Sequence, residues 1–202
     1  MKSEAPVFAR NAEATRRRVL DAATVEFAAY GLAGGRTARI ARTAGTNQRM
    51  IYAYFESKDG LFDAVLQHHI TAAQHAITFD AGDLPGYAQR VFDFYRANPA
   101  MVRLAMWQSL ERPGLMASLP EVVTAMREKI EAIEQAQQDG CLCSAVPAHR
   151  LLDQILTLAH GNIADAAHPE CWTDQHRRDL GVAVATLAHP ERAVRTAVQQ
   201  QD

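Results

Sequence analysis

Apolar residues recur three and four positions apart along nearly all of this 202-residue chain, and no stretch alternates convincingly with a period of two. Such spacing puts apolar side chains on one stripe of an α-helix, so the pattern predicts an all-α protein. Glycine and proline divide the pattern, because Gly favours helix ends and Pro favours helix starts. We predict helices at about residues 14–30, 37–44, 47–55, 57–79, 87–97, 99–112, 120–139, 148–167 and 173–188.

The second and third helices are short and are separated by Gly45, behind a longer first helix that Gly31 is placed to end. Thr37 is a good N-cap for the second helix, and Asn47 can cap the third. Two short helices joined by a glycine turn are typical of a helix-turn-helix unit, whose second helix enters the DNA major groove. A long fourth helix, capped by Ser57, leads from this head into the rest of the chain.

The third helix opens with "TNQRMIYAYF", in which polar side chains precede an aromatic rear. We expect Met50, Ile51 and Tyr54 to face inward and the polar N-terminal side to face DNA. Asn and Gln amides can pair with adenine, Arg suits guanine, and Tyr can reach a phosphate or a thymine methyl group. The predicted base and groove contacts are Asn47, Gln48, Arg49 and Tyr52. The predicted phosphate contacts are Thr37, Arg39, Arg42 and Lys58.

Charge decides between this interpretation and a plainer one, in which the same residues are helix caps and solvated arginines. Residues 1–58 contain ten Lys and Arg against five Asp and Glu, whereas residues 59–202 contain eleven against eighteen. A basic head on an acidic body indicates a polyanion partner for the head alone. The joint placement of these residues on a glycine-turned helix pair in the basic part of the chain therefore favours DNA binding.

Two segments, "RRRVLDAATVEFAAYG" and "RTARIARTAGTNQRMIYAYFESKDGLFDAVL", resemble the DNA-binding head of the TetR/AcrR regulators over about residues 16–66. The resemblance implies an all-helical homodimer that usually represses transcription and releases DNA when a small ligand enters its C-terminal body. It also implies a recognition helix at residues 47–54, with Lys58 as the phosphate anchor. Arg49 stands where many relatives have a small residue, so the base preference is expected to be this chain's own.

The expected organisation is a three-helix DNA-binding domain at residues 1–57 and a larger helical effector-binding and dimerisation domain at residues 58–202. Ligand pockets are mostly apolar with a few polar groups. Most aromatic and methionine side chains of the body are expected to be ordinary core. The predicted pocket wall consists of Tyr95, Met106 and Trp107, because such side chains are large or adaptable. A small apolar or aromatic effector would fit best.

The last two predicted helices differ from the others in their apolar surface. The helix at residues 148–167 has more of it than one core-facing side needs, and the last helix offers small residues that permit close approach. We predict that both helices pair with their copies in a four-helix dimer interface, which suits a palindromic operator. The predicted interface residues are Leu152, Ile155, Leu156, Ala159, Ile163, Gly181, Val184, Ala185 and Ala188.

Metal binding and catalysis form the rival class of function. His68 and His75 lie two turns apart on one predicted helix, but no group of His, Cys, Asp or Glu has a recognised ligand spacing. No phosphate loop, nucleophile motif or carboxylate pair stands out, so we predict no metal, no cofactor and no enzymatic activity. A redox role for Cys141 and Cys143 stays open. The alternative function is a ligand- or metal-binding helical protein whose head no longer reads DNA.

No apolar run approaches the roughly 18 residues that a membrane helix needs, and the first residues lack the apolar stretch of a signal peptide. Three cysteines, two of them in a tight pair, suit a reducing compartment better than a disulfide framework. The sequence therefore predicts a soluble, cytoplasmic protein with free thiols.

Overall fold

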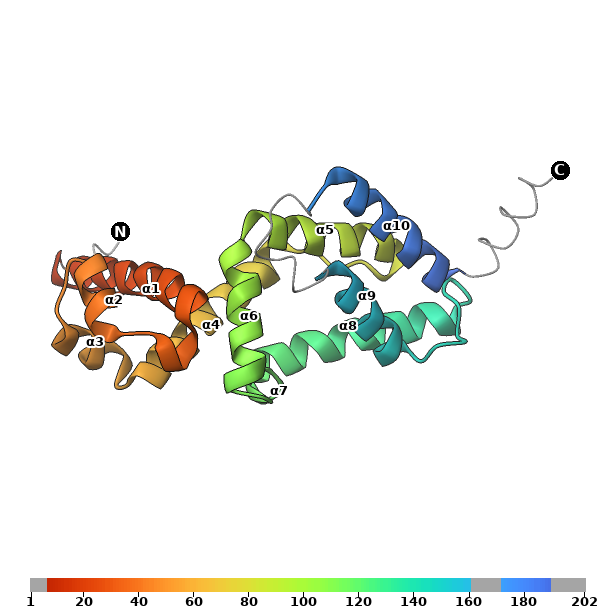
Figure 1. The fold of residues 1–202 in the computed structure, drawn as a ribbon. Helices are drawn as coiled ribbons and strands as arrows, with labels where there is room; N and C mark the ends of the chain where they lie inside the picture. The colour runs from red at the N-terminus through yellow and green to blue at the C-terminus, as the bar shows by residue number, and fades with distance from the viewer. Residues whose placement is uncertain (1–6, 161–171, 190–202) are drawn as a thin grey trace. The chain divides into compact units, whose positions relative to one another are not determined.

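The computed structural model describes residues 7–160 and 172–189, and these residues fold into helices joined by turns (Figure 1). The all-α prediction is confirmed. In chain order the helices are α1 (Val7–Gly34), α2 (Thr37–Thr43), α3 (Gln48–Phe55), α4 (Lys58–Ala76), the 3-10 helix η1 (Ala81–Asp83), α5 (Leu84–Ala97), α6 (Pro99–Glu111), α7 (Leu115–Ser118), α8 (Pro120–Gln138), α9 (Ala148–Ala159) and α10 (Asp174–Ala188). The part of the predicted ninth helix beyond residue 160 lies outside the described residues.

The chain divides into two compact units, which we call the head and the body. The head consists of Met1–Ala72 and Arg103–Pro113, and the body of Ala73–Val102 and Gly114–Asp202. Helices α4 and α6 each contribute residues to both units. Among the described residues, no helix is both long and apolar enough to cross a membrane.

The head core is built from one face each of α1 to α4. Phe27 of α1 and Phe62 of α4 are fully buried, and their rings meet edge to face with centroids 5.1 Å apart. Helices as short as α2 and α3 are unstable in isolation, so this packing holds them. As predicted, α2 buries Ile40 and Ala41. Gly45, between α2 and α3, has the left-handed φ of 64° that glycine adopts most readily.

Helix α1 is broken at Gly31, whose φ of 70° and ψ of −176° lie outside the helical region. The predicted end of the regular helix at this glycine is confirmed, although one further turn follows it. The backbone amides of Leu32 and Ala33 donate to the carboxylate of Glu111, at 2.5 and 3.1 Å. Glu111 is the last residue of α6, so a side chain from far along the sequence caps the amides that follow the break.

The same part of α6 also contacts α1 just before the break. In a continuous helix the Ala28 carbonyl would accept from the amide four residues later. Here it accepts hydrogen bonds from Arg103 Nε at 2.7 Å and from Trp107 Nε1 at 3.3 Å. A Cβ atom at Gly31 would lie 2.7 Å from the Trp107 ring. Position 31 therefore needs glycine both for its φ and for this close approach.

The body is organised around α5, which packs against α9 and α10, while α8 packs against α9. Its core contains Tyr87 and Phe92 of α5, Ile133 of α8, Ile155 of α9 and Val184 of α10. All five side chains are at most 2% exposed. Burial of such large side chains is the main source of stability in a unit of this size.

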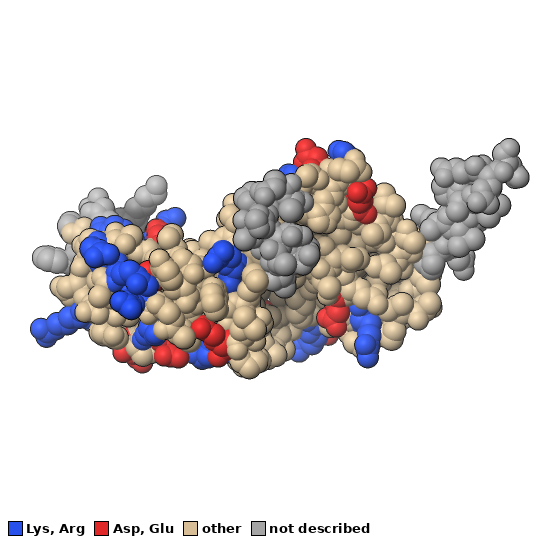
Figure 2. All heavy atoms as spheres, in the orientation of Figure 1, with Lys and Arg blue, Asp and Glu red and all other residues tan. Residues whose placement is uncertain are grey.

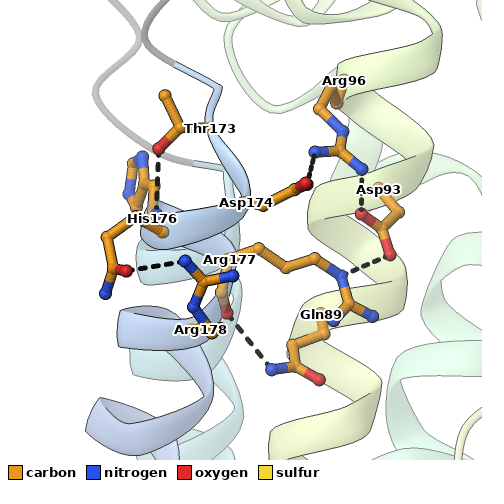
Figure 3. A network of polar contacts seen from close by, with 9 residues as sticks. Gln89, Asp93, Arg96, Thr173, Asp174, His176, Arg177 and Arg178 are labelled. Atoms are coloured by element: carbon orange, nitrogen blue, oxygen red, sulfur yellow. Dashed lines mark hydrogen bonds and ion pairs between the residues drawn. The ribbon is translucent and has the colours of Figure 1, made fainter.

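A chain of ion pairs fixes the first turns of α10 to α5 (Figure 3). Asp93 accepts from Arg177 Nε at 2.7 Å and from Arg96 Nη2 at 3.0 Å. Arg96 Nη1 reaches Asp174 at 2.7 Å, and Gln89 Nε2 donates to the Arg177 carbonyl at 3.2 Å. Partly exposed pairs contribute little energy individually. Apolar burial thus drives the packing of α10 on α5, and the polar contacts set how the two helices align.

Candidate nucleic-acid interface

Helix α3 is anchored in the head by two residues and leaves its N-terminal side open. Asn47 caps the helix, as predicted, and its Oδ1 accepts from the Met50 amide at 3.0 Å. Ile51 and Phe55 are 0% and 6% exposed. Arg49 is exposed and makes no ion pair within the part of the chain that the structure describes. Its guanidinium group is therefore available to a partner outside the chain.

Met50 and Tyr52 lie on the outward side of α3, where they are 36% and 44% exposed. The prediction that Met50 faces inward is wrong. The buried stripe is centred on Ile51 and Phe55, and the spacing of four between these two was the signal that could have placed Met50 outside. An exposed methionine at this position offers an apolar contact to a thymine methyl group. Sequence reasoning therefore missed one candidate groove residue.

Thr37 links α2 to α3. It is the first residue of α2 and is buried, whereas Arg36 occupies the N-cap position and makes no side-chain cap bond. The predicted cap role of Thr37 is therefore wrong. Its Oγ1 accepts a hydrogen bond from Gln48 Nε2 at 2.9 Å and lies 3.3 Å from Tyr52 Oη. Two predicted groove residues are thus oriented by a hydroxyl of the preceding helix.

Arg39 is engaged within the head. Its Nε lies 2.8 and 3.0 Å from the two carboxylate oxygens of Glu26, its Nη2 lies 2.6 Å from Oε1, and its guanidinium lies over the Tyr30 ring. Burial alone would raise the pKa of Glu26, but the hydrogen bonds from Arg39 and from the Arg36 amide outweigh burial, so this pKa is lowered. The charge of Arg39, which we predict to meet a phosphate, is already balanced by this carboxylate.

The other two predicted phosphate cations differ in their surroundings. Lys58 lies at the start of α4, and its Nζ donates to the carbonyls of Ala33 and Gly35, at 3.3 Å each. The amides of a helix N-terminus favour an anion near this position. Arg42, in the last turn of α2, is exposed. The phosphate contacts of both residues stay predictions.

Figure 2 shows Lys and Arg side chains gathered on the head, with Asp and Glu mainly along its lower margin in that view. Besides Arg42 and Arg49, the head exposes Arg17 and Arg36, and none of the four makes an ion pair within residues 7–160 and 172–189. Sequence reasoning missed Arg17 and Arg36. The place of Arg36 immediately before α2 was the signal that could have identified it, since a cation there lies beside the helix pair.

The predicted pocket residues do not all belong to one unit. Tyr95 lies in the body, half-buried, with its ring edge to face with His160 at a centroid distance of 4.7 Å. Met106 and Trp107 belong to the head. Trp107 packs against Gly31, as described above, which gives it a structural role apart from any ligand. The structure therefore does not bring the three residues together within one unit.

Most of the predicted dimer-interface residues lie in the core of the body. Leu152, Ile155, Ala159, Val184 and Ala188 are at most 1% exposed. Gly181 is also buried, Leu156 and Ala185 are half-buried, and Ile163 lies outside the described residues. The stripes that we predict to meet a partner subunit pack against other helices of the same chain, so these buried side chains have almost no surface left to offer. The exposed apolar residues of the same helices are Leu158 and Val182, 40% and 67% exposed.

Among the described residues, no three His, Cys, Asp or Glu side chains gather as a metal site would require. His69 Nε2 lies 2.9 Å from Thr24 Oγ1, within the head. Cys141 is exposed and Cys143 is half-buried, and both are free thiols. Burial lowers the pKa of His69, and none of these three residues belongs to a candidate metal site among the described residues.

A glycine-turned pair of short helices, with an open polar side on the second, defines the head as a helix-turn-helix DNA-binding domain. Residues 19–65 match the family described as "Bacterial regulatory proteins, tetR family", and residues 83–200 match "Tetracyclin repressor-like, C-terminal domain". The chain belongs to the TetR family of transcriptional regulators, which are DNA-binding proteins and not enzymes. The resemblance seen in the sequence is confirmed, as is the two-part helical organisation.

Similar proteins extend this result over most of the chain. The HTH-type transcriptional repressor SCO4008 of Streptomyces coelicolor is 34% identical over 155 residues, which cover 75% of this chain and 80% of the relative. The HTH-type transcriptional repressor NicS of Pseudomonas putida is 34% identical over 141 residues, 62% of this chain and 66% of the relative. The crystal structure of the regulator SCO4942 from Streptomyces coelicolor has a TM-score of 0.73 and 34% identity, covering 86% of this chain and 98% of that one.

Proposed function

We propose that the protein is a repressor that binds a palindromic operator as a homodimer and releases it when a small apolar or aromatic effector enters the body. The relatives SCO4008 and NicS are both described as transcriptional repressors, which supports repression. The observation that carries the proposal is the open side of α3, where Arg49 and Tyr52 are exposed while Ile51 and Phe55 anchor the helix.

Each exposed group of α3 has a distinct role in this proposal. Arg49 reads guanine through its two-pronged guanidinium group, and Gln48 offers its amide to adenine. Tyr52 and Met50 contact a phosphate or a thymine methyl group. Arg42, together with the start of α4 at Lys58, holds phosphates and sets the register without reading sequence.

Dimerisation follows from the symmetry of the target. A two-fold operator needs two heads whose recognition helices are about 34–36 Å apart, or a multiple of that distance. The exposed apolar side chains of α9 and α10, Leu158 and Val182, support a partner contact on the sides of these helices that the body core leaves free. Isologous contacts of this kind repeat the same patch on both subunits.

Release requires communication between effector and head. Helices α4 and α6 each belong partly to the body and partly to the head, which supports them as the connection. Effector binding that tilts α4 would change the separation of the two recognition helices, and a shift of a few Å would lose contacts on one half-site. Crystal structures with and without effector that show equal separations would contradict this part of the proposal.

The test of function is selection of bound duplexes from a random DNA pool at moderate salt, followed by sequencing. Enrichment of an inverted repeat is the expected result, and the spacing of its halves would give the geometry of the dimer. Enrichment of no sequence by a folded, dimeric protein would contradict the proposal and favour ligand capture by a protein whose head no longer reads DNA.

Arg49→Ala should reduce discrimination between the selected duplex and one with a changed guanine by about 1–3 kcal/mol, because a two-pronged contact is lost. Arg42→Ala, the matched control on α2, should weaken both duplexes equally and lower the salt slope by about one charge. Fluorescence anisotropy over a range of salt measures both quantities. Equal weakening of the two duplexes by Arg49→Ala would show that Arg49 holds a phosphate and reads no base.

Thr37→Val should weaken operator binding by about 1 kcal/mol while leaving the head folded. Valine keeps the buried shape of threonine but removes the hydroxyl that accepts from Gln48 and contacts Tyr52, and one such hydrogen bond contributes about that much. Thr43→Val, at an exposed position of the same helix, is the control. An unchanged dissociation constant for Thr37→Val would mean that the two groove residues need no orientation from α2.

A further inference from the structure

Lys129 is a charged residue on the apolar side of α8. The residues Met126, Ile130 and Ile133 of this helix pack into the body core, and Lys129 lies within the same stripe. It is half-buried, and its Nζ lies over the face of the Tyr87 ring, 5.5 Å from the ring centre, in a cation–π contact. Within the described residues it has no acidic partner in an ion pair. Burial of a cation is costly, and desolvation lowers the pKa of Lys129, although the charge of the neighbouring Glu128 opposes part of this shift.

Tyr87 places a second polar group, its hydroxyl, in the same region as Lys129. It is only 2% exposed, and its ring meets Phe79 edge to face at 4.9 Å. Its hydroxyl makes no hydrogen bond to any described residue. Burial raises the pKa of Tyr87 to about 12, so its hydroxyl stays protonated and can donate a hydrogen bond.

Tyr95 and His160 continue this line of polar groups in the body. Tyr95 lies eight residues after Tyr87 on α5, a rise of about 12 Å along the helix. It is close enough that its charge would raise the pKa of Tyr87 further. The His160 ring meets the Tyr95 ring at 4.7 Å, and neither side chain has a hydrogen-bond partner in residues 7–160 and 172–189. Burial lowers the pKa of His160, which keeps the ring neutral at neutral pH.

We propose that Lys129, Tyr87, Tyr95 and His160 form the effector site and that the effector is a small organic monoanion with an aromatic or apolar body. This inference rests on the proposed function, because it assigns the chemistry of the ligand that the body binds. One cation that has no acidic partner among the described residues suits one carboxylate or sulfonate, which would also accept a hydrogen bond from the Tyr87 hydroxyl. Phe79, Met126 and Ile130 supply apolar surface beside it. Tyr95, about 12 Å further along α5 than Tyr87, and the neutral His160 ring beside it can bind a hydrogen-bonding group of the ligand.

Two fluorescent probes of matched shape test the anionic part of this inference. 8-Anilino-1-naphthalenesulfonate carries a sulfonate, and N-phenyl-1-naphthylamine has the same aryl amine without it. In titrations of the full chain, Lys129→Met should weaken binding of the sulfonate probe by about tenfold or more and leave the neutral probe within about twofold, since only the charge-assisted contact is lost. Arg127→Met, on the exposed side of the same helix, should change neither value.

Equal changes for both probes, no change for the sulfonate probe, or no saturable binding of it to the unaltered protein would each overturn the inference. Lys129→Met removes an unpaired charge from a helix that tolerates Met, so its melting temperature should not fall. Tyr87→Phe is the second variant and should weaken the sulfonate probe by a smaller factor while preserving the ring. If probe binding depends on Lys129 but the protein enriches no operator, the ligand site is supported and the proposed regulatory function is contradicted. If the protein enriches an operator but probe binding does not depend on Lys129, the regulatory function is supported and the ligand site is contradicted.

Discussion

Gly31→Ala should lower the free energy of unfolding of the head by about 2–5 kcal/mol. A left-handed φ costs a residue with a side chain about 1–2 kcal/mol, and forcing a methyl group into a packed site costs about 1–3 kcal/mol more. The added Cβ would meet the Trp107 ring at 2.7 Å, and Gly31 already has a φ of +70°. The variant should therefore lose the contact between α6 and the broken end of α1.

Tryptophan fluorescence can measure this change in the head alone. The chain has two tryptophans, and Trp172 belongs to the body, so a Trp172→Phe background leaves Trp107 as the reporter. Gly45→Ala is the matched control, because Gly45 has a φ of +64° and open space around its Cβ position. It should show the φ cost of about 1–2 kcal/mol alone. Equal urea midpoints for the two variants would show that Trp107 does not restrict position 31.

Glu26→Gln should destabilise the head by about 2–4 kcal/mol at neutral pH. The Glu26 side chain is buried, with 8% of its surface exposed, and it balances Arg39, which is 31% exposed. Removing one partner of a buried pair costs about 3–5 kcal/mol, and partial solvation of Arg39 reduces that figure. The Arg36 backbone N–H donates a hydrogen bond to the Glu26 carboxylate, and the side-chain amide of glutamine would be a weaker acceptor for it.

The same variant should change how stability depends on pH. Because folding lowers the pKa of Glu26 below its ordinary value of 4.5, its contribution is complete above that value and is lost as pH falls through the lowered pKa. The difference in unfolding free energy between the native protein and Glu26→Gln should therefore shrink on acidification below 4.5. Glu13→Gln, an exposed position on the same helix, should show neither effect. Carboxylates titrate within about pH 7 to 3. A difference in unfolding free energy that stays constant over this range would contradict the lowered pKa of Glu26.

The parts of the head that could be predicted from sequence depend on local signals. Asn47 caps α3, and Ser57 Oγ accepts from the Gly60 amide at the start of α4. Gly45 and Gly31 both adopt the left-handed φ that a turn or helix end requires. Such signals act over a few residues, so they can be recognised in the sequence without knowledge of the tertiary structure.

What could not be predicted depends on partners distant in sequence. Arg39 looks like a free surface cation until the buried Glu26 of α1 is placed beside it. Trp107 looks like a pocket residue until α6 is seen to meet α1. The apolar stripes of α9 and α10 could be recognised in the sequence, but a stripe does not show which surface packs against it. In the structure, other helices of the same chain bury Ile155 and Val184. Periodicity predicts a buried face and leaves its neighbour open.

The end of α6 also bears on how such regulators can be recombined. Arg103–Pro113 is part of the head but is separated from the rest of it by the intervening body residues. A chimera joined within the α4–α5 connection would take the head away from Glu111 and Trp107, leaving the amides after Gly31 and the Ala28 carbonyl without these partners. Exchange of DNA specificity between family members is therefore expected to succeed only when the graft carries both pieces, or when the recipient already supplies an equivalent acid and indole.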